Sequence, residues 1–250
     1  MKMIMKKAHT YLYRGSVAFF FFLLWPLLYY FSRKPERYKH MNVIRRIWGF
    51  LSSAVVGILY AFDVEQPIDW SRTYIICPNH TSNLDITAMS LLVKNNCCFM
   101  GKEELVNGLV TGLFFRTVDI PVNRESKMAS FRAFKQVMER LEKGMTAIIF
   151  PEATIPDNFP PSLHEFKNGP FRMAIELKIP IIPVTSLDTW EVLWDDGLKF
   201  GSRPGVCHIF VHKPIETAHL TIDDADNLRD TVYGLISNKL NEHDHRRTNG

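Results

Sequence analysis

Beyond Asp63, short apolar runs alternate with segments whose apolar residues recur at helical spacing. The apolar runs predict strands at 73–77, 97–100, 119–122, 146–150, 179–184 and 206–215. The segments between and after them predict helices at 84–94, 103–115, 126–144, 168–178 and 223–240. Strands and helices that alternate at this spacing are typical of an α/β domain with a mixed, largely parallel central sheet flanked by helices.

The first 62 residues follow a different pattern, with two long uncharged runs. Val17 to Phe31 holds fifteen residues without a charge, and Ile47 to Phe62 holds sixteen. As helices these runs would span about 22–24 Å, less than the roughly 30 Å hydrocarbon core of a bilayer, and Pro26 is predicted to break the first. The pattern favours a helical hairpin that dips into one leaflet. A full span over 11–31 and a pair of core helices are the alternatives.

Composition excludes a disordered chain, because 46% of the residues are apolar and 22% are charged. The net charge of +4 conceals an asymmetry: residues 1–46 hold ten Lys or Arg and one acid, while the other 204 residues hold 20 basic and 25 acidic side chains. Basic residues beside apolar runs favour a membrane surface over nucleic acid as the partner. Because retained basic flanks stay on the inner side, we expect the cytoplasmic face of a membrane.

We therefore expect a basic, apolar anchoring hairpin at 1–66 and an α/β domain at 67–250. The four cysteines form no Cys-x-x-Cys pair, which argues against a cysteine-based zinc site. His208 and His212 would lie about 13 Å apart on a strand, too far to share one ion. We expect no metal.

The first predicted strand ends at a group of polar residues that includes His80 and Asp85. In open α/β sheets, ligands bind at the carboxyl ends of strands. The two side chains meet only if His80 lies in the loop and Asp85 in the first turn of the next helix. Asp85 would then accept Nδ1–H and leave Nε2 as a general base. The alternative is that Asp85 caps the helix and His80 is an ordinary loop histidine.

Two further strand ends carry polar residues. The predicted strand 146–150 is followed by a carboxylate at Glu152 and a hydroxyl at Thr154. The predicted strand 119–122 is followed by Arg124, whose guanidinium would suit a phosphate. Lys102 and Lys167 are weaker candidates for the same role. The alternatives are a turn in which Glu152 pairs with a nearby base, and a surface Arg124.

These groups form blocks in a fixed order along the chain. The blocks are Asn79-His80 through Asp85, Gly101-Lys102-Glu103-Glu104-Leu105 with Val122-Asn123-Arg124, Phe150-Pro151-Glu152-Ala153-Thr154, the link Phe166-Lys167-Asn168-Gly169, and Ile179-Pro180-Ile181-Ile182-Pro183-Val184. Together they resemble the PlsC-like glycerolipid acyltransferases, the 1-acylglycerol-3-phosphate O-acyltransferase family. The resemblance covers roughly residues 70–190, and four blocks in this order are a specific signal.

The resemblance implies transfer of a fatty acyl group from acyl-CoA or acyl-carrier protein to the free sn-2 hydroxyl of 1-acylglycerol-3-phosphate (lysophosphatidic acid), giving phosphatidic acid. It implies His80 as general base and Asp85 as its orienting carboxylate. Substrate contacts then fall on a set that the motifs define: Asn79, Lys102, Arg124, Glu152, Ala153, Thr154 and Lys167. No cofactor or metal is expected, because a thioester is already activated.

Two positions depart from the family's pattern. Ala153 replaces a glycine, and its Cβ would cost on the order of 1 kcal/mol if the backbone there needs glycine's freedom. Ile155 stands where many members have arginine. The alternatives are therefore an acyltransferase for another lyso-lipid head group, or a catalytically idle lipid-binding module on the same fold.

Overall fold

A mixed, largely parallel sheet forms the centre of the molecule, as the sequence predicts. The computed structural model describes residues 2–123 and 126–249. In these residues the sheet has seven strands: β1 (Ile58–Val64), β2 (Ile75–Pro78), β3 (Cys97–Lys102), β4 (Ile120–Val122), β5 (Thr146–Ile149), β6 (Ile181–Ser186) and β7 (Gly205–Val211). Their order is β1-β7-β6-β2-β5-β3-β4. Only β6 and β7 pair antiparallel, so the carboxyl ends of β2 to β6 meet at one edge.

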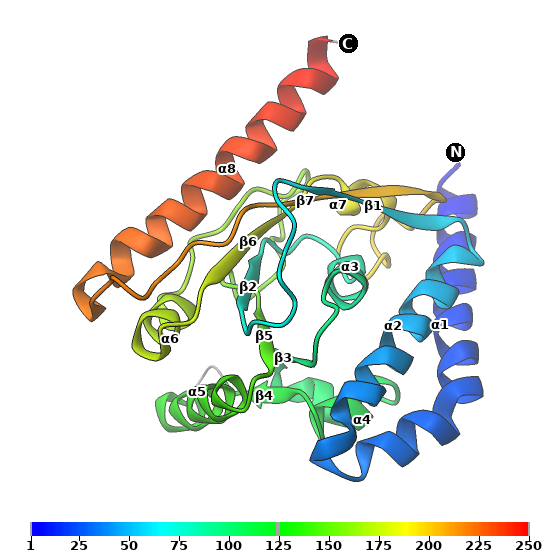
Figure 1. Cartoon of the computed structure of the whole chain (residues 1–250). Coiled ribbons are helices and arrows are strands. Elements are labelled where there is room, and N and C mark those ends of the chain that lie inside the picture. The colour runs from blue at the N-terminus through cyan, green and yellow to red at the C-terminus, as the bar shows by residue number, and fades with distance from the viewer. Residues whose placement is uncertain (1, 124–125, 250) are drawn as a thin grey trace.

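Helices cover both faces of this sheet (Figure 1). On one face lies α3 (Leu84–Leu92); on the other lie α5 (Lys127–Glu142), α6 (Gly169–Leu177) and α8 (Ala225–Asn249). A hairpin of α1 (Met3–Ser32) and α2 (Tyr38–Ala54), joined by the 3-10 turn Pro35–Arg37, packs beside α3 and the short helix α4 (Thr111–Phe115). The remaining short elements are α7 (Thr189–Val192), η2 (Glu103–Asn107) and η3 (Ile222–Asp224).

Burial on both faces explains why the central strands are apolar throughout. Ile76 and Ile148 pack on the side of α3, whereas Ile75 and Ile181 pack on the side of α5, α6 and α8. β2 lies between β5 and β6, and Ile75 stands opposite residues of both neighbours. A central parallel strand has no solvent-facing side, so its residues do not alternate with polar ones.

Pro26 does not break the first apolar run, contrary to the prediction. α1 continues without interruption from Met3 to Ser32. A proline inside a helix costs about 3 kcal/mol. Phe21 and Leu28, on either side of it, are fully buried in the main core, and burying such side chains contributes about 1.5–3 kcal/mol each. Tertiary packing therefore outweighs the local preference.

The second apolar run is helical only as far as Ala54, which corrects the prediction of a helix to Phe62. Gly57, with φ +75°, ends the helical segment, and β1 then pairs with β7 in parallel register. Ile58 is buried while Leu59 is exposed, the alternation of a half-covered strand. β1 lies on the N-terminal side of the predicted division at 66/67 and is nevertheless part of the central sheet.

The predicted helix at 103–115 is two short elements, because the chain is extended at Gly108. Thr111 donates from its hydroxyl to the Leu105 carbonyl at 2.7 Å and closes the turn between them. The last strand ends at Val211, earlier than predicted, and the last helix runs on to Asn249. Ser126 caps the start of α5, since its hydroxyl accepts from the Ala129 N–H.

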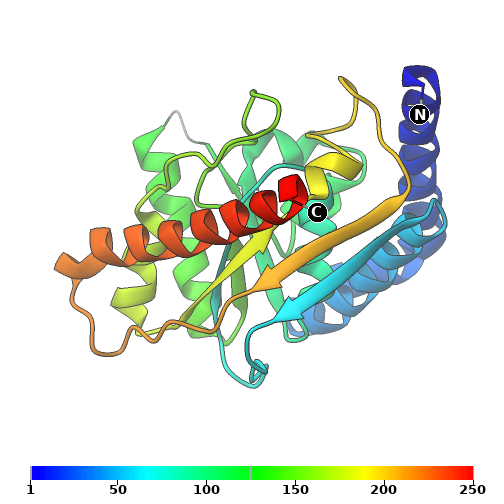
Figure 2. The same cartoon turned by 90° about the horizontal axis from the view of Figure 1, so that it is seen from above.

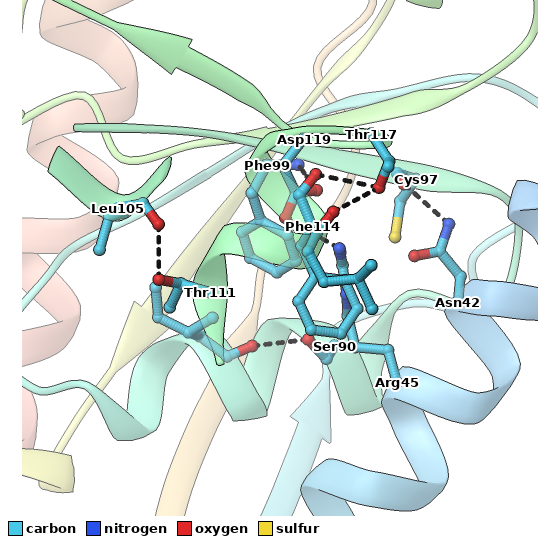
Figure 3. A network of polar contacts seen from close by, with 12 residues as sticks. Asn42, Arg45, Ser90, Cys97, Phe99, Leu105, Thr111, Phe114, Thr117 and Asp119 are labelled. Carbon is cyan, nitrogen blue, oxygen red and sulfur yellow. Dashed lines mark hydrogen bonds and ion pairs between the residues drawn. The ribbon is translucent and has the colours of Figure 1, made fainter. Parts of the chain in front are cut away.

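α2 is fixed to the sheet by buried polar contacts (Figure 3). Arg45 Nη2 lies 2.8 Å from Asp119 Oδ2, and both side chains are about 5% exposed or less. The other oxygen of Asp119 accepts from the Phe99 N–H at 3.0 Å, and the guanidinium lies 4.2 Å from the Phe114 ring centre. Asn42 donates to the Cys97 carbonyl. The hairpin is therefore joined to the α/β body by specific pairs.

Arg45→Met is expected to lower the free energy of unfolding by about 3–5 kcal/mol, because Asp119 would stay buried without its cation. Burial already raises the pKa of Asp119, and Arg45 opposes that rise. Urea unfolding followed by circular dichroism measures the loss. The double variant Arg45→Met/Asp119→Asn should lose less than the single variant. A single-variant loss below about 1 kcal/mol would contradict a net role for the pair.

Candidate active site

His80 and Asp85 meet in the way the sequence predicts. His80 lies in the loop after β2, and Asp85 is in the first turn of α3. His80 Nδ1 is 3.1 Å from Asp85 Oδ2. The imidazole is 14% exposed and Asp85 is fully buried, and the ring stacks on Phe150 with centres 4.1 Å apart. The local chain therefore positions one histidine with one edge accessible.

Both oxygens of the Asp85 carboxylate accept hydrogen bonds. Oδ2 accepts from the N–H groups of Thr81 and Ser82 at 2.8 and 2.9 Å, and Oδ1 accepts from the Thr189 hydroxyl at 2.7 Å. An ionised carboxylate only accepts, so the His80 nitrogen that faces it carries the hydrogen. Nε2 is left with a free lone pair, as a general base requires.

Asp85 also holds the start of α3, so the alternative interpretation is partly correct. Its bonds to the backbone of Thr81 and Ser82 are those of a residue that organises a helix entry. Ser82 contributes by accepting from the Leu84 N–H at 3.0 Å. One carboxylate thus both orients the imidazole and fixes the loop that carries it.

Glu152 connects two loops through hydrogen bonds. Among the described residues, its carboxylate forms no ion pair with a basic side chain. Its Oε1 accepts from the His80 N–H at 2.7 Å, and its Oε2 from the His164 N–H at 2.8 Å. The side chain is 3% exposed, and burial raises its pKa to about 7 against the effect of the two N–H donors. It lies at the wall of a small cavity of about 360 Å³ beneath α8.

The other predicted contacts separate into those at the site and those away from it. Lys102, Ala153 and Thr154 line the cavity that His80 also lines. The Asn79 amide is buried and exchanges two hydrogen bonds with the Ser186 backbone. Lys167 is exposed and lines neither cavity. Arg124 lies outside the described residues.

A mostly apolar cavity of about 620 Å³ opens at the carboxyl edge of the sheet beside His80. It extends between α1, α2, α3 and α4, where its wall includes Val17, Trp48, Phe99 and Phe114. Its volume falls in the range of small-molecule sites. The accessible edge of the imidazole therefore faces a space that suits a long apolar group.

Ala153 adopts the left-handed backbone conformation, with φ +63°. This conformation costs a residue with a Cβ about 1–2 kcal/mol. Ala153→Gly is therefore expected to raise the free energy of unfolding by about 1 kcal/mol without lowering kcat. Urea unfolding measures the change, and Ala129→Gly within α5 should have the opposite sign. If Ala153→Gly lowers the free energy of unfolding, the Cβ makes a contact that stabilises the fold by more than the backbone strain costs.

Two contacts at the site carry no signal in the sequence. Thr189, which donates to Asp85, lies 104 residues further along the chain. Phe150 reads as the last residue of an apolar strand, yet its ring supports the imidazole. A long-range polar partner and a stacking ring have no local pattern, so only the folded chain reveals them.

The site therefore combines an imidazole, a buried carboxylate and an apolar cavity on a mixed α/β sheet. Residues 61–187 match the family described as Acyltransferase. The chain belongs to this family and is an acyltransferase, which confirms the prediction.

The chain is similar in sequence to proteins named as 1-acyl-sn-glycerol-3-phosphate acyltransferases and in fold to one solved structure. It is 26% identical over 224 residues to the mouse 1-acyl-sn-glycerol-3-phosphate acyltransferase alpha, covering 88% of this chain and 75% of that protein. It is 28% identical over 211 residues to 1-acyl-sn-glycerol-3-phosphate acyltransferase of Haemophilus influenzae, covering 82% and 83%. The crystal structure of the LPA acyltransferase PlsC from Thermotoga maritima has a TM-score of 0.79 over 97% of both chains, at 20% identity, which is a likeness of fold.

Proposed function

We propose that this acyltransferase moves a fatty acyl group from a thioester donor to the sn-2 hydroxyl of 1-acylglycerol-3-phosphate, giving phosphatidic acid. The observation that carries the proposal is the His80–Asp85 pair at the mouth of the apolar cavity. The matched relatives named for this reaction support the choice of acceptor. Acyl-CoA and acyl-carrier protein are both suitable donors, and no further cofactor is needed.

In the proposed reaction His80 Nε2 takes the proton of the acceptor hydroxyl while its oxygen attacks the thioester carbonyl carbon. The new C–O bond forms and the C–S bond breaks. The proton then passes from the imidazolium to the leaving thiolate. Asp85 stabilises the imidazolium between these steps. The cavity walls keep the acyl chain out of water, which limits competing hydrolysis.

We also assign the protein to the cytoplasmic face of a membrane. Within the described residues, α1 is long and apolar enough to cross a bilayer, and only 17% of its most apolar stretch is buried. Its exposed side chains include Phe19, Phe22, Leu23 and Leu27. A hairpin that holds the site at the leaflet avoids solvating the acyl chains, at about 0.8 kcal/mol per CH₂.

A different head group is the second candidate, because carboxylates stand at the cavity mouth. Asp157, Asp195 and Asp196 line it together with Lys102 and Arg14, and Arg14 already lies 3.4 Å from Asp196. Burial and the neighbouring carboxylate Asp196 raise the pKa of Asp195. A zwitterionic or amine-bearing head group would suit these charges.

Thiol release from acyl-CoA, with and without an acceptor, tests the proposal on purified protein. The acceptors are lysophosphatidic acid, a lysophosphatidylethanolamine and a monoacylglycerol, and acyl-carrier protein replaces CoA in a second series. Release that depends on lysophosphatidic acid supports the proposed reaction. Preference for the zwitterionic acceptor selects the second candidate, and no release with any combination leaves only a lipid-binding module.

A further inference from the structure

Several large apolar side chains outside the hairpin are exposed to solvent. Outside the hairpin, Leu109, Met128 and Phe131 are the most exposed of the large apolar residues described, at 75%, 69% and 68%. Phe159 and Leu198 are exposed at 48% each. We call these five residues the catalytic rim. Single exposed apolar residues are ordinary, but a group on one edge marks an interaction surface.

The topology places the whole rim on one edge of the sheet. Leu109 follows β3, Met128 and Phe131 follow β4, Phe159 follows β5, and Leu198 follows β6. These strands run parallel to β2, which leads into His80. The connections that carry the rim therefore lie at the catalytic edge (Figure 2).

The start of α1 reaches the same edge. The N–H of Ser202, in the connection after β6, donates to the Lys6 carbonyl at 3.0 Å. The hydroxyl of Thr10 donates to the hydroxyl of the same serine at 3.0 Å. Ile4 is 80% exposed beside these contacts. The start of α1 therefore lies beside the connection after β6.

Aromatic residues and charges around the rim favour a lipid surface. Phe159 packs on Phe200 and Trp194, with ring centres 4.3 and 5.7 Å away, and the Lys199 ammonium lies 5.0 Å from the Trp194 ring centre. Trp194 is 6% exposed, so the exposed members of this group are the Phe159 ring and the Lys199 side chain. An apolar ring beside an ammonium suits a membrane–water interface. Bases such as Lys102 are interspersed with the carboxylates at the mouth, so the edge lacks the single-sign field of a nucleic-acid site.

We propose that the catalytic rim inserts into the headgroup region of a lipid bilayer, as a contact separate from the α1–α2 hairpin. The proposal rests on the proposed function, because the acceptor it names resides in that bilayer. Insertion from several connections would set the mouth of the cavity at the depth of the acceptor hydroxyl. Since the charges are mixed, apolar burial provides the attraction, and binding should depend weakly on salt.

An environment-sensitive fluorophore on Met128→Cys tests insertion directly. The four native cysteines are buried, and burial raises the pKa of each thiol, so the label reacts with the new cysteine. The measurement uses the His80→Ala background and phosphatidylcholine vesicles, with or without a nitroxide high on the acyl chain. Emission should rise with vesicles and be quenched by the nitroxide.

Ile222→Cys is the matched control for the label. It is 43% exposed and follows β7, whose carboxyl end lies at the opposite edge of the sheet. Its label should stay in water. If the labelled Met128→Cys protein floats with the vesicles but the emission of its label does not change, the proposal is overturned. Because His80 is absent, the outcome is independent of whether the enzyme uses the proposed acceptor.

The double variant Met128→Ser/Phe131→Ser should partition onto vesicles about tenfold less than the wild type or lower still. Its rate should fall in parallel on vesicle-borne acceptor and stay unchanged on a short-chain, monomeric acceptor. Val64→Ser/Ile222→Ser, which removes apolar residues of the opposite edge, should match the wild type. Unchanged partition, or a dimer in sedimentation that the rim variant dissociates, would overturn the proposal.

Discussion

His80→Ala is expected to lower kcat by about 10²–10⁴-fold, the contribution typical of a positioned general base. The side chain is 14% exposed and contacts Asp85 and the Phe150 ring. Its loss removes no buried backbone partner, so the free energy of unfolding should change by no more than about 1 kcal/mol. Initial rates of acceptor-dependent thiol release, with thermal unfolding alongside, measure both effects.

The chain provides its own control for this substitution. His208 is also bonded to a carboxylate, with Nδ1 2.6 Å from Asp188 Oδ2, but it is 52% exposed and lies outside the cavity. His208→Ala should therefore keep the wild-type rate. Equal rates for His80→Ala and the wild type would remove His80 from the mechanism, and equal losses in both variants would point to a general effect on folding.

Asp85→Asn is expected to lower kcat by on the order of 10³–10⁴-fold, because an amide that faces Nδ1 no longer specifies the reactive tautomer. The variant should also lose about 1–3 kcal/mol of folding free energy. The backbone donors at Thr81 and Ser82 share Oδ2, and an amide keeps a single acceptor oxygen. Steady-state rates and urea unfolding on the same preparation separate the two effects.

Thr189→Val separates orientation of the imidazole from support of the helix start. It removes the donor to Asp85 Oδ1 and the bond to the Thr81 hydroxyl. It leaves the bonds of Asp85 to His80 and to the backbone N–H groups of Thr81 and Ser82. We expect a kcat loss smaller than that of Asp85→Asn. Asp85→Asn with a wild-type rate and reduced stability would mean that the carboxylate only organises the start of α3.

The local sequence predicted six of the seven strands in their order, and the condition under which His80 meets Asp85. Both depend on interactions within a few residues. Apolar runs specify buried strands, a cap at Ser126 specifies a helix start, and a five-residue spacing across a loop–helix junction brings two side chains together. The motif blocks added the family, because their order along the chain is itself specific.

Tertiary structure alone decided the features that depend on partners far along the chain. Pro26 stays within one helix because core packing of Phe21 and Leu28 outweighs the local cost. Residues 58–64 become a strand because β7, more than 140 positions later, supplies hydrogen bonds. Glu152 binds two backbone N–H groups instead of a base. In each case the deciding energy comes from contacts that form only when the chain is folded, so no local pattern encodes them.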